Sequence, residues 1–323
     1  MILISPITEA QQFENIKKYI QPAVKNGGFA MEDYILWCPS VIKVGKTYHM
    51  FASRWPAKYG MGGWTKYSEC VRATSDNLYG PYTFQEIVLQ KRPDSWDNSR
   101  VHNVKIIKDG SKYLLFYINS ANQTGYAEAD SITGPWIRTD KPVIHFSNPA
   151  PLVRADGSIY VFGRLGDANK VNRGVACTAP SYKGPYTMVA NGDNLLPDNC
   201  ELEDPTLWWA NNQYNVICND WKAKATGIFK AGAQYYSRDG IHYHLVSSQP
   251  VFNRAEPVIY DDGSTEKFER RERPFVFINE KNEVMALFTA NLTSGGTAKI
   301  VVQPVNHYYP REAGKQAVAK SGK

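Results

Sequence analysis

Hydrophobic residues along this chain fall in short runs separated by turn-forming residues, and the order of these runs repeats. A polar or charged pair, usually with a proline, precedes a hydrophobic strand, a tight turn and a second, aromatic-rich strand. The repeat covers residues 37–51, 102–117, 148–162, 199–220 and 272–288. Hydrophobic runs of this length that meet at Gly, Asn or Asp turns predict β-hairpins.

A second turn, Gly-Pro followed by an aromatic residue, lies between the copies. It occurs at residues 80–82, 134–136 and 184–186, and Asp239-Gly240 takes this place in the fourth copy. The copies begin about 45 to 70 residues apart, which is typical of four-stranded propeller blades. The sequence therefore predicts an all-β fold, a five-bladed β-propeller. We expect residues 299–302 to form an outer strand and residues 2–4 to close the ring.

Only one segment has a helical pattern. Between Thr8 and Val24, Thr8 suits an N-cap, while Phe13, Ile16 and Ile20 share one face. The sequence thus predicts a short N-terminal helix before the strands. The domain prediction is a single propeller over residues 1–310 followed by a polar tail over residues 311–323.

Composition excludes several classes of partner. The net charge of +6 comes from scattered basic residues, without the basic and aromatic tract of a nucleic-acid site. No apolar run approaches the ~20 residues of a membrane span. Five cysteines without a CxxC pair argue against a disulfide framework and a zinc site, so no metal or other cofactor is expected. We expect a cytoplasmic protein, or a periplasmic one if a leader was removed. The oligomeric state stays open.

The candidate chemistry lies where the strands of each hairpin begin and end, because these positions gather around the axis of a propeller. Glu203 and Asp204 form the strongest acidic pair, and Glu272 opens the fifth copy. Glycoside cleavage needs one carboxyl group held protonated and another that is ionised. The expected substrate-binding residues are Cys38, Arg54, Trp55, His102, Asn103, Asn119, Asn148, Arg164, Asp220, Trp221 and Arg271.

The blade openings resemble those of the five-bladed glycoside hydrolases of family 43 and its relatives in families 32, 68, 117 and 130. In family 43, Asp-Pro opens blades one and three, and Glu-x-Pro opens blade four. Glu203-Asp204-Pro205 matches Glu-x-Pro, so the resemblance implies that Glu203 is the general acid, with Asp204 tuning it. Cys38-Pro39 and Asn148-Pro149 replace the two Asp-Pro pairs. Glu272-Arg273-Pro274 repeats the Glu-x-Pro form and is expected to supply the base or nucleophile.

Two other functions remain open at this point. In the family 130 phosphorylases, which the Glu-Asp-Pro motif also resembles, the Asp of that motif is the acid and phosphate replaces the base. Asp204 would then be the acid, and arginines at 54, 164 and 271 could hold phosphate. A non-catalytic sugar-binding propeller is the other alternative. Asp97 and the pair Glu32-Asp33 are further candidates for the missing base, and the arginines favour an acidic or highly hydroxylated sugar.

Overall fold

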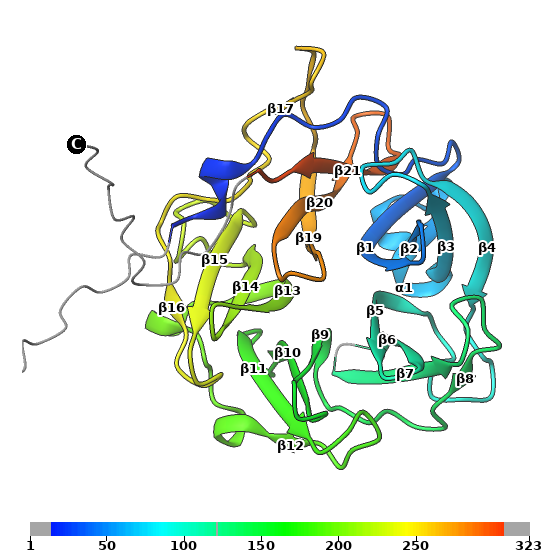
Figure 1. Cartoon of the computed structure of the whole chain (residues 1–323), viewed down its shortest axis with the longest axis vertical. Coiled ribbons are helices and arrows are strands. Elements are labelled where there is room, and N and C mark those ends of the chain that lie inside the picture. Colours follow the sequence, from blue (N-terminus) through cyan, green and yellow to red (C-terminus); the bar gives the residue numbers. More distant parts are fainter. Residues whose placement is uncertain (1–13, 121, 307–323) are drawn as a thin grey trace, which may run out of the picture.

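The computed structural model describes residues 14–120 and 122–306. Small β-sheets stand around a common centre, in chain order around the ring (Figure 1). Their innermost strands are β1 (Tyr34–Val44), β5 (His102–Asp109), β9 (Ser147–Val153), β13 (Leu202–Ala210) and β19 (Arg270–Ile278). Each inner strand contacts the next, and β19 contacts β1, so these strands form a closed cycle. The expectation of an all-β fold is confirmed.

Three sheets have four antiparallel strands each, paired in chain order from the inner strand outward. The first adds β6 (Lys112–Ser120), β7 (Gln123–Ala129) and β8 (Ile137–Arg138) to β5. The second adds β10 (Ile159–Gly166), β11 (Asn172–Ala179) and β12 (Thr187–Met188) to β9. The third adds β14 (Gln213–Asp220), β15 (Gly232–Ser237) and β16 (His244–Leu245) to β13. Each of these sheets is the hairpin repeat extended outward.

The beginning and the end of the described chain share one larger sheet, with strand order β19-β20-β21-β1-β2-β3-β4. The added strands are β2 (Thr47–Pro56), β3 (Glu69–Ser75), β4 (Thr83–Leu89), β20 (Val284–Leu292) and β21 (Ala298–Pro304). A single parallel bridge, Ile35 with Ala298, joins the two halves. A separate pair, β17 (Val258–Ile259) and β18 (Thr265–Glu266), lies on the long connection before β19.

Residues 20–29 of the N-terminal segment pair with strands and connections near the end of the described chain. Ile20 bridges Val305, Ala23 bridges Tyr260 and Phe29 bridges Ile300. The segment expected to close the ring, residues 2–4, and the polar tail, residues 311–323, lie outside the described residues.

The predicted helix over residues 8–24 is wrong for the part that the structure describes. A 3₁₀ turn, η1 (Ile16–Tyr19), is the helical structure there, and the chain after it is extended. Pro22 cannot donate a backbone hydrogen bond, and the amides on either side of it bond to neighbouring strands: Gln21 N to Pro304 O at 2.8 Å and Ala23 N to Ile259 O at 2.8 Å. Pairing with strands therefore replaces the helix.

The other helical turns lie in connections. They are η2 (Ala57–Tyr59), η3 (Met61–Gly63), α1 (Trp64–Tyr67), η4 (Val189–Gly192) and η5 (Pro197–Asn199). In the described part of the chain, no helix is long and apolar enough to cross a membrane.

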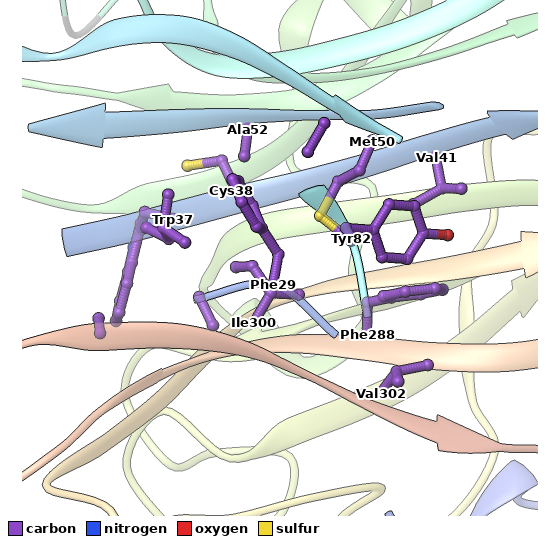
Figure 2. Packing of buried hydrophobic residues seen from close by; sticks show 14 of the residues in the cluster. Phe29, Trp37, Cys38, Val41, Met50, Ala52, Tyr82, Phe288, Ile300 and Val302 are labelled. Atoms are coloured by element: carbon purple, nitrogen blue, oxygen red, sulfur yellow. The ribbon is translucent and has the colours of Figure 1, made fainter. Parts of the chain in front are cut away.

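The core consists of apolar clusters between neighbouring sheets. One cluster joins the two halves of the larger sheet, where Phe29, Met50 and Phe288 pack together (Figure 2). Trp37 and Cys38 belong to the same cluster and begin the inner strand β1. The N-terminal segment contributes Phe29, which is 2% exposed, so this segment is part of the core as well as of the pairing.

Candidate active site

Each inner strand has the same backbone irregularity near its beginning. The inner-strand pairing shifts register there, which is the mark of a β-bulge. One non-glycine residue in each irregular stretch has a positive φ between 53° and 58°: Cys38, Asn103, Asn148, Asp204 and Arg273. A residue in this left-handed region costs on the order of 1 kcal/mol or more unless its surroundings fix it. The same conformation at five equivalent positions therefore indicates that contacts around the axis fix the backbone there.

The side chains at these five positions bond to one another across the axis and form what we call the axial ring. The Cys38 thiol donates to Asn103 Oδ1 at 2.9 Å. Arg273 Nη1 donates to both Asn103 Oδ1 and Asp204 Oδ1, and Asn148 Nδ2 donates to Asp204 Oδ1. These residues and Lys105 surround a void of only about 10 Å³. A void of that size holds at most about one water molecule, so the axial ring is close to sealed.

Asp204 is the acidic member of the axial ring, and opposing effects act on its carboxyl group. Arg273 and the side-chain amides of Asn148 and Asn219, the latter at 2.9 Å, donate to it and favour its charge. Burial and the carboxylates of Glu203 and Glu272 favour the proton. The balance raises the pKa of Asp204 to about 7. Asp204 therefore changes its protonation near neutral pH.

Glu203 and Glu272 lie one residue before Asp204 and Arg273, on the inner strands β13 and β19. Their side chains are 14% and 6% exposed. Lys230 lies between them, with Nζ 3.4 Å from Glu203 Oε2 and 3.1 Å from Glu272 Oε2. Arg164 Nη1 adds a contact of 3.1 Å to Glu203 Oε1. Two carboxylates from neighbouring strands thus face each other across one ammonium group.

An aromatic wall stands beside these carboxylates, on the connection between β14 and β15. Lys230 Nζ lies 4.9 Å from the centre of the Trp221 ring and 5.8 Å from that of Phe229. The two rings are 5.7 Å apart, and Phe229 is 46% exposed. Exposed aromatic faces next to paired carboxylates provide a stacking surface for a sugar ring. Trp221 thus lies beside Lys230, and its contact with a substrate stays a prediction.

Asp220 does not face a ligand, contrary to the prediction. It is 1% exposed, and both carboxylate oxygens accept hydrogen bonds from the connection that follows. The donors are the backbone amides of Lys224, Ala225 and Thr226 and the hydroxyl of Thr226, at 2.8 to 3.1 Å. Asp220 therefore shapes the connection that carries Trp221 and Lys230.

Two predicted ligands at the end of β2 are buried within the larger sheet. Trp55 is fully buried, and its indole N–H donates to Gly60 O at 2.9 Å. Arg54 pairs with Glu69 at 2.9 Å and lies against the rings of Tyr34 and Phe84. Neither residue presents a free surface to a sugar, so both predictions are corrected. The reason is that β1 begins at Tyr34 and pairs with the end of β2.

Asn119 and Arg271 also have structural contacts in place of the predicted ones. Asn119 Oδ1 accepts from the amide of Ser99 at 3.2 Å and from its hydroxyl at 2.5 Å, which fixes the connection before β5. Arg271 is 5% exposed, donates to Gln303 and lies over the ring of Phe252. Burial lowers the pKa of Arg271 to about 10. Both side chains therefore support the fold and lie away from Glu203.

His102 and Cys38 are neighbours, although 64 positions separate them in sequence. His102 Nε2 is 3.8 Å from Cys38 Sγ, and His102 Nδ1 is 2.9 Å from Ser68 Oγ. The Ser68 hydroxyl donates its hydrogen bond to Val101 O. Burial lowers the pKa of His102 well below its usual value and raises the pKa of Cys38 to about 11. Both groups are therefore neutral near pH 7. His102 is 1% exposed and stacks on Trp64, so it lies beneath the surface.

The three other candidates for the base are Asp97, Glu32 and Asp33. Among the described residues, none of them has a contact with Glu203 or Glu272. Asp97 is fully buried and bonds to Arg92, Tyr117 and Arg138 at 2.8 to 3.1 Å. These donors hold the pKa of Asp97 below its usual value. Glu32 and Asp33 are exposed just before β1. Asp97 is thus a structural carboxylate.

The carboxylates could also be viewed as metal ligands. Glu203, Asp204 and Glu272 bring one oxygen each within 4.8 Å of one another. However, Arg164, Lys230 and Arg273 already pair with these oxygens. A cation would have to displace basic side chains, so the donor set fits a charge-balanced cluster better than a metal centre.

Sequence reasoning missed two basic residues that organise the site. Lys230 lies in an irregular connection, where no periodic pattern indicates which side chain turns inward. Arg273 is the middle residue of the Glu-x-Pro form in the fifth copy, and the bulge makes it the fifth member of the axial ring. Its position immediately before Pro274 matches Cys38-Pro39, Asn148-Pro149 and Asp204-Pro205, and that signal could have identified it.

Comparisons with known proteins bear on the fold of this chain. No protein-family model matches the sequence, and no curated protein matches it. Among solved structures, a glycoside hydrolase is similar over 94% of this chain and 96% of its own, with a TM-score of 0.68 and 13% identity. The chain has the fold of the β-propeller glycoside hydrolases.

Two further structures connect this fold to named families. A family 117 glycoside hydrolase from the marine bacterium Zobellia galactanivorans has a TM-score of 0.61 at 14% identity, over 88% of this chain and 89% of its own. A family 43 β-xylosidase/α-arabinofuranosidase from a compost metagenome, in complex with xylotriose, has a TM-score of 0.59 at 13% identity, over 88% and 93%. The resemblance to the family 43 superfamily is confirmed at the level of fold.

Proposed function

We propose that this chain is a five-bladed β-propeller glycoside hydrolase that removes a terminal sugar from an oligosaccharide. The observation that carries the proposal is the pair Glu203 and Glu272, which face each other across Lys230 beside an exposed aromatic wall. In this assignment the blades are built on β1, β5, β9, β13 and β19, and the N-terminal segment completes the last one.

The separation of the carboxylates favours a retaining mechanism. One oxygen of Glu203 lies within 4.8 Å of one oxygen of Glu272, and the carboxyl groups of retaining enzymes are the closer pair, ~5–5.5 Å apart against ~6.5–9.5 Å in inverting enzymes. Glu203 donates a proton to the leaving glycosidic oxygen while Glu272 attacks the anomeric carbon. Water then cleaves the glycosyl ester, and Glu203 takes the proton from that water.

The basic residues have separate tasks in this mechanism. Lys230 contacts both carboxylates, so it stabilises the ionised nucleophile Glu272 at the start of the reaction. Arg164 orients Glu203 through the contact at 3.1 Å. Trp221 and Phe229 would stack on the sugar, and the two cations favour an acidic or highly hydroxylated one.

A phosphorylase is the second candidate, and one observation favours it. The pKa of Asp204 is about 7, which is the value expected of an acid that works at neutral pH. Phosphate would then replace the base and bind to Arg164 and Lys230. However, Asp204 is 5% exposed and surrounded by donors, so the hydrolase remains the better assignment.

The test is turnover of a panel of aryl glycosides and oligosaccharides, with and without phosphate, by the wild type and by Glu203→Gln and Glu272→Gln. We expect each substitution to lower kcat by roughly 10³-fold or more without a phosphate requirement. Glu269→Gln, which changes an exposed glutamate just before β19, is the matched control and should retain activity. Turnover that requires phosphate and survives Glu272→Gln would contradict the hydrolase.

A further inference from the structure

A second chamber lies at the other end of the central axis. Beyond the axial ring, the inner strands continue and enclose a cavity of about 840 Å³. Every inner strand contributes to its lining, so it is centred on the axis and open at the far end of these strands. Glu203 and Glu272 do not line it. Because the void at the axial ring is only about 10 Å³, the chamber is separated from the paired carboxylates.

Apolar side chains form the wall of the chamber, one from each inner strand. Each inner strand places one half-buried hydrophobic side chain there: Ile42, Ile107, Leu152, Leu207 and Phe275. Concave apolar surface that remains accessible to water is unfavourable unless something covers it. The volume of the chamber lies in the range of pockets that hold a small organic molecule, about 300–1,000 Å³.

Lys105 lies at the floor of this chamber, and its charge has no partner there. It lines both the chamber and the axial void, and its ammonium is 5.4 Å from the centre of the Phe275 ring. Among the described residues, no carboxylate forms an ion pair with it. The charge of Asp204 acts on Lys105 without an ion-pair contact, and Arg273 already pairs with that carboxylate. Burial lowers the pKa of Lys105 to about 8, so the group is still mostly charged at neutral pH.

The rim of the chamber is also basic. Lys43, Lys108 and Lys281 line it, and Glu280 is the acidic residue among the described lining. These three lysines form no ion pair with any described residue. A concave apolar site with one half-buried ammonium group at its floor and several at its rim concentrates small anions.

We propose that this chamber binds an amphiphilic carboxylate, with its apolar body against the five-sided wall and its carboxylate on Lys105. A sugar is a poor occupant, because the wall offers it few hydrogen-bonding groups. One ammonium at the floor matches one negative charge, which favours a monoanion over a phosphate dianion. This site is separate from the carbohydrate site and does not rest on the proposed hydrolysis.

The test uses the full chain and calorimetric titration with decanoate, decanol and decyltrimethylammonium, which share a chain length and differ in charge. Decanoate should bind once per chain and roughly tenfold more tightly than decanol, and the cation should bind least. Lys105→Met, which keeps the length of the side chain but not its charge, should weaken decanoate binding roughly tenfold. Lys108→Met, at the exposed rim, is the matched control and should stay within about twofold.

Two more variants keep the result interpretable. Leu152→Glu places a carboxylate on the wall and should weaken decanoate binding even if Lys105→Met does not fold. The double variant Glu203→Gln, Glu272→Gln should bind decanoate like the wild type, because those residues lie at the other end of the axis. Equal binding by Lys105→Met and the wild type, equal affinity for decanoate and decanol, or loss of binding in the double variant would each overturn the proposal.

Discussion

The five equivalent positions of the axial ring carry four kinds of side chain, and only two of the five are ionisable partners of opposite sign. Asp204 and Arg273 are the acid and the base of the ring, and the other three members are neutral. An aspartate at 38 or 148, as the resemblance to family 43 would require, would add a second negative charge to a ring whose own cation, Arg273, already pairs with Asp204. In the proposed hydrolase, Glu272 supplies the second carboxylate, so neither Cys38 nor Asn148 needs to be acidic.

The protonation of Asp204 predicts how stability depends on pH. Its pKa is about 7 in the folded protein against an ordinary 3.8, so the folded state holds a proton that the unfolded state has lost. This contribution to the free energy of unfolding is therefore present at low pH and falls as pH rises from about 4 to 7, by at most roughly 1.4 kcal/mol per pH unit. Asp204→Asn lacks this group.

Urea denaturation of the wild type and Asp204→Asn between pH 4.5 and 8 measures the effect. The difference in the free energy of unfolding between the two proteins should shift in favour of the variant as pH rises, whatever its value at pH 4.5. Subtracting the variant cancels the other titrating groups. A difference that stays constant across this range would show that Asp204 keeps its charge throughout.

At the scale of elements, the connection between β14 and β15 depends on one carboxylate. Asp220 accepts four hydrogen bonds from residues 224–226, and this connection carries both Trp221 and Lys230. Asp220→Ala should lower the free energy of unfolding by about 1–3 kcal/mol, because buried amides lose their acceptor. It should also lower kcat/KM, since Lys230 would no longer be held between Glu203 and Glu272.

Asp239→Ala is the control for this prediction. Asp239 accepts from the amides of Ile241 and His242 and from the hydroxyl of Ser237, in the turn after β15. That turn lies at the opposite end of β15 from the Lys230 connection, so its loss should affect stability but not turnover. If both variants lose activity in proportion to stability, the connection after β14 has no special role in the site.

The repeat of hydrophobic and turn-forming residues explains which parts of this architecture could be predicted from the sequence. The hairpin repeat located all five inner strands, and the carboxylates at their openings do meet at the axis. The predictions at strand ends fared worse, because a bulge shifts the alternation of side chains. Arg54 and Trp55 pair with Leu36 and Ile35 inside the sheet, which no hydrophobic pattern reveals. Lys230 could not be found for a related reason: only the folded connection brings it inward.

At the scale of the whole molecule, the two ends of the axis have different chemistry. One end has paired carboxylates, basic residues and an aromatic wall, and the other has an apolar chamber with lysines. The axial ring separates them with a hydrogen-bonded layer in which Asp204 and Arg273 are the charged members. Because the inner strands contribute to both ends, the integrity of the ring of sheets matters for both.

Closure of that ring gives the last prediction, which compares two phenylalanines. Phe29 is 2% exposed and packs in the cluster between the first and last strands, where its backbone also pairs with Ile300. Phe29→Ala should lower the free energy of unfolding by about 3–5 kcal/mol, and amides of β21 should exchange faster than those of β10.

Phe229, which is 46% exposed, provides the matched substitution. Phe229→Ala should change stability by less than about 0.5 kcal/mol but lower kcat/KM, because it removes a stacking surface. Denaturation and hydrogen exchange of both variants measure the effect on stability, and steady-state kinetics measure the effect on turnover. If the Phe29→Ala protein is as stable as the Phe229→Ala protein, the N-terminal segment does not hold the ring closed.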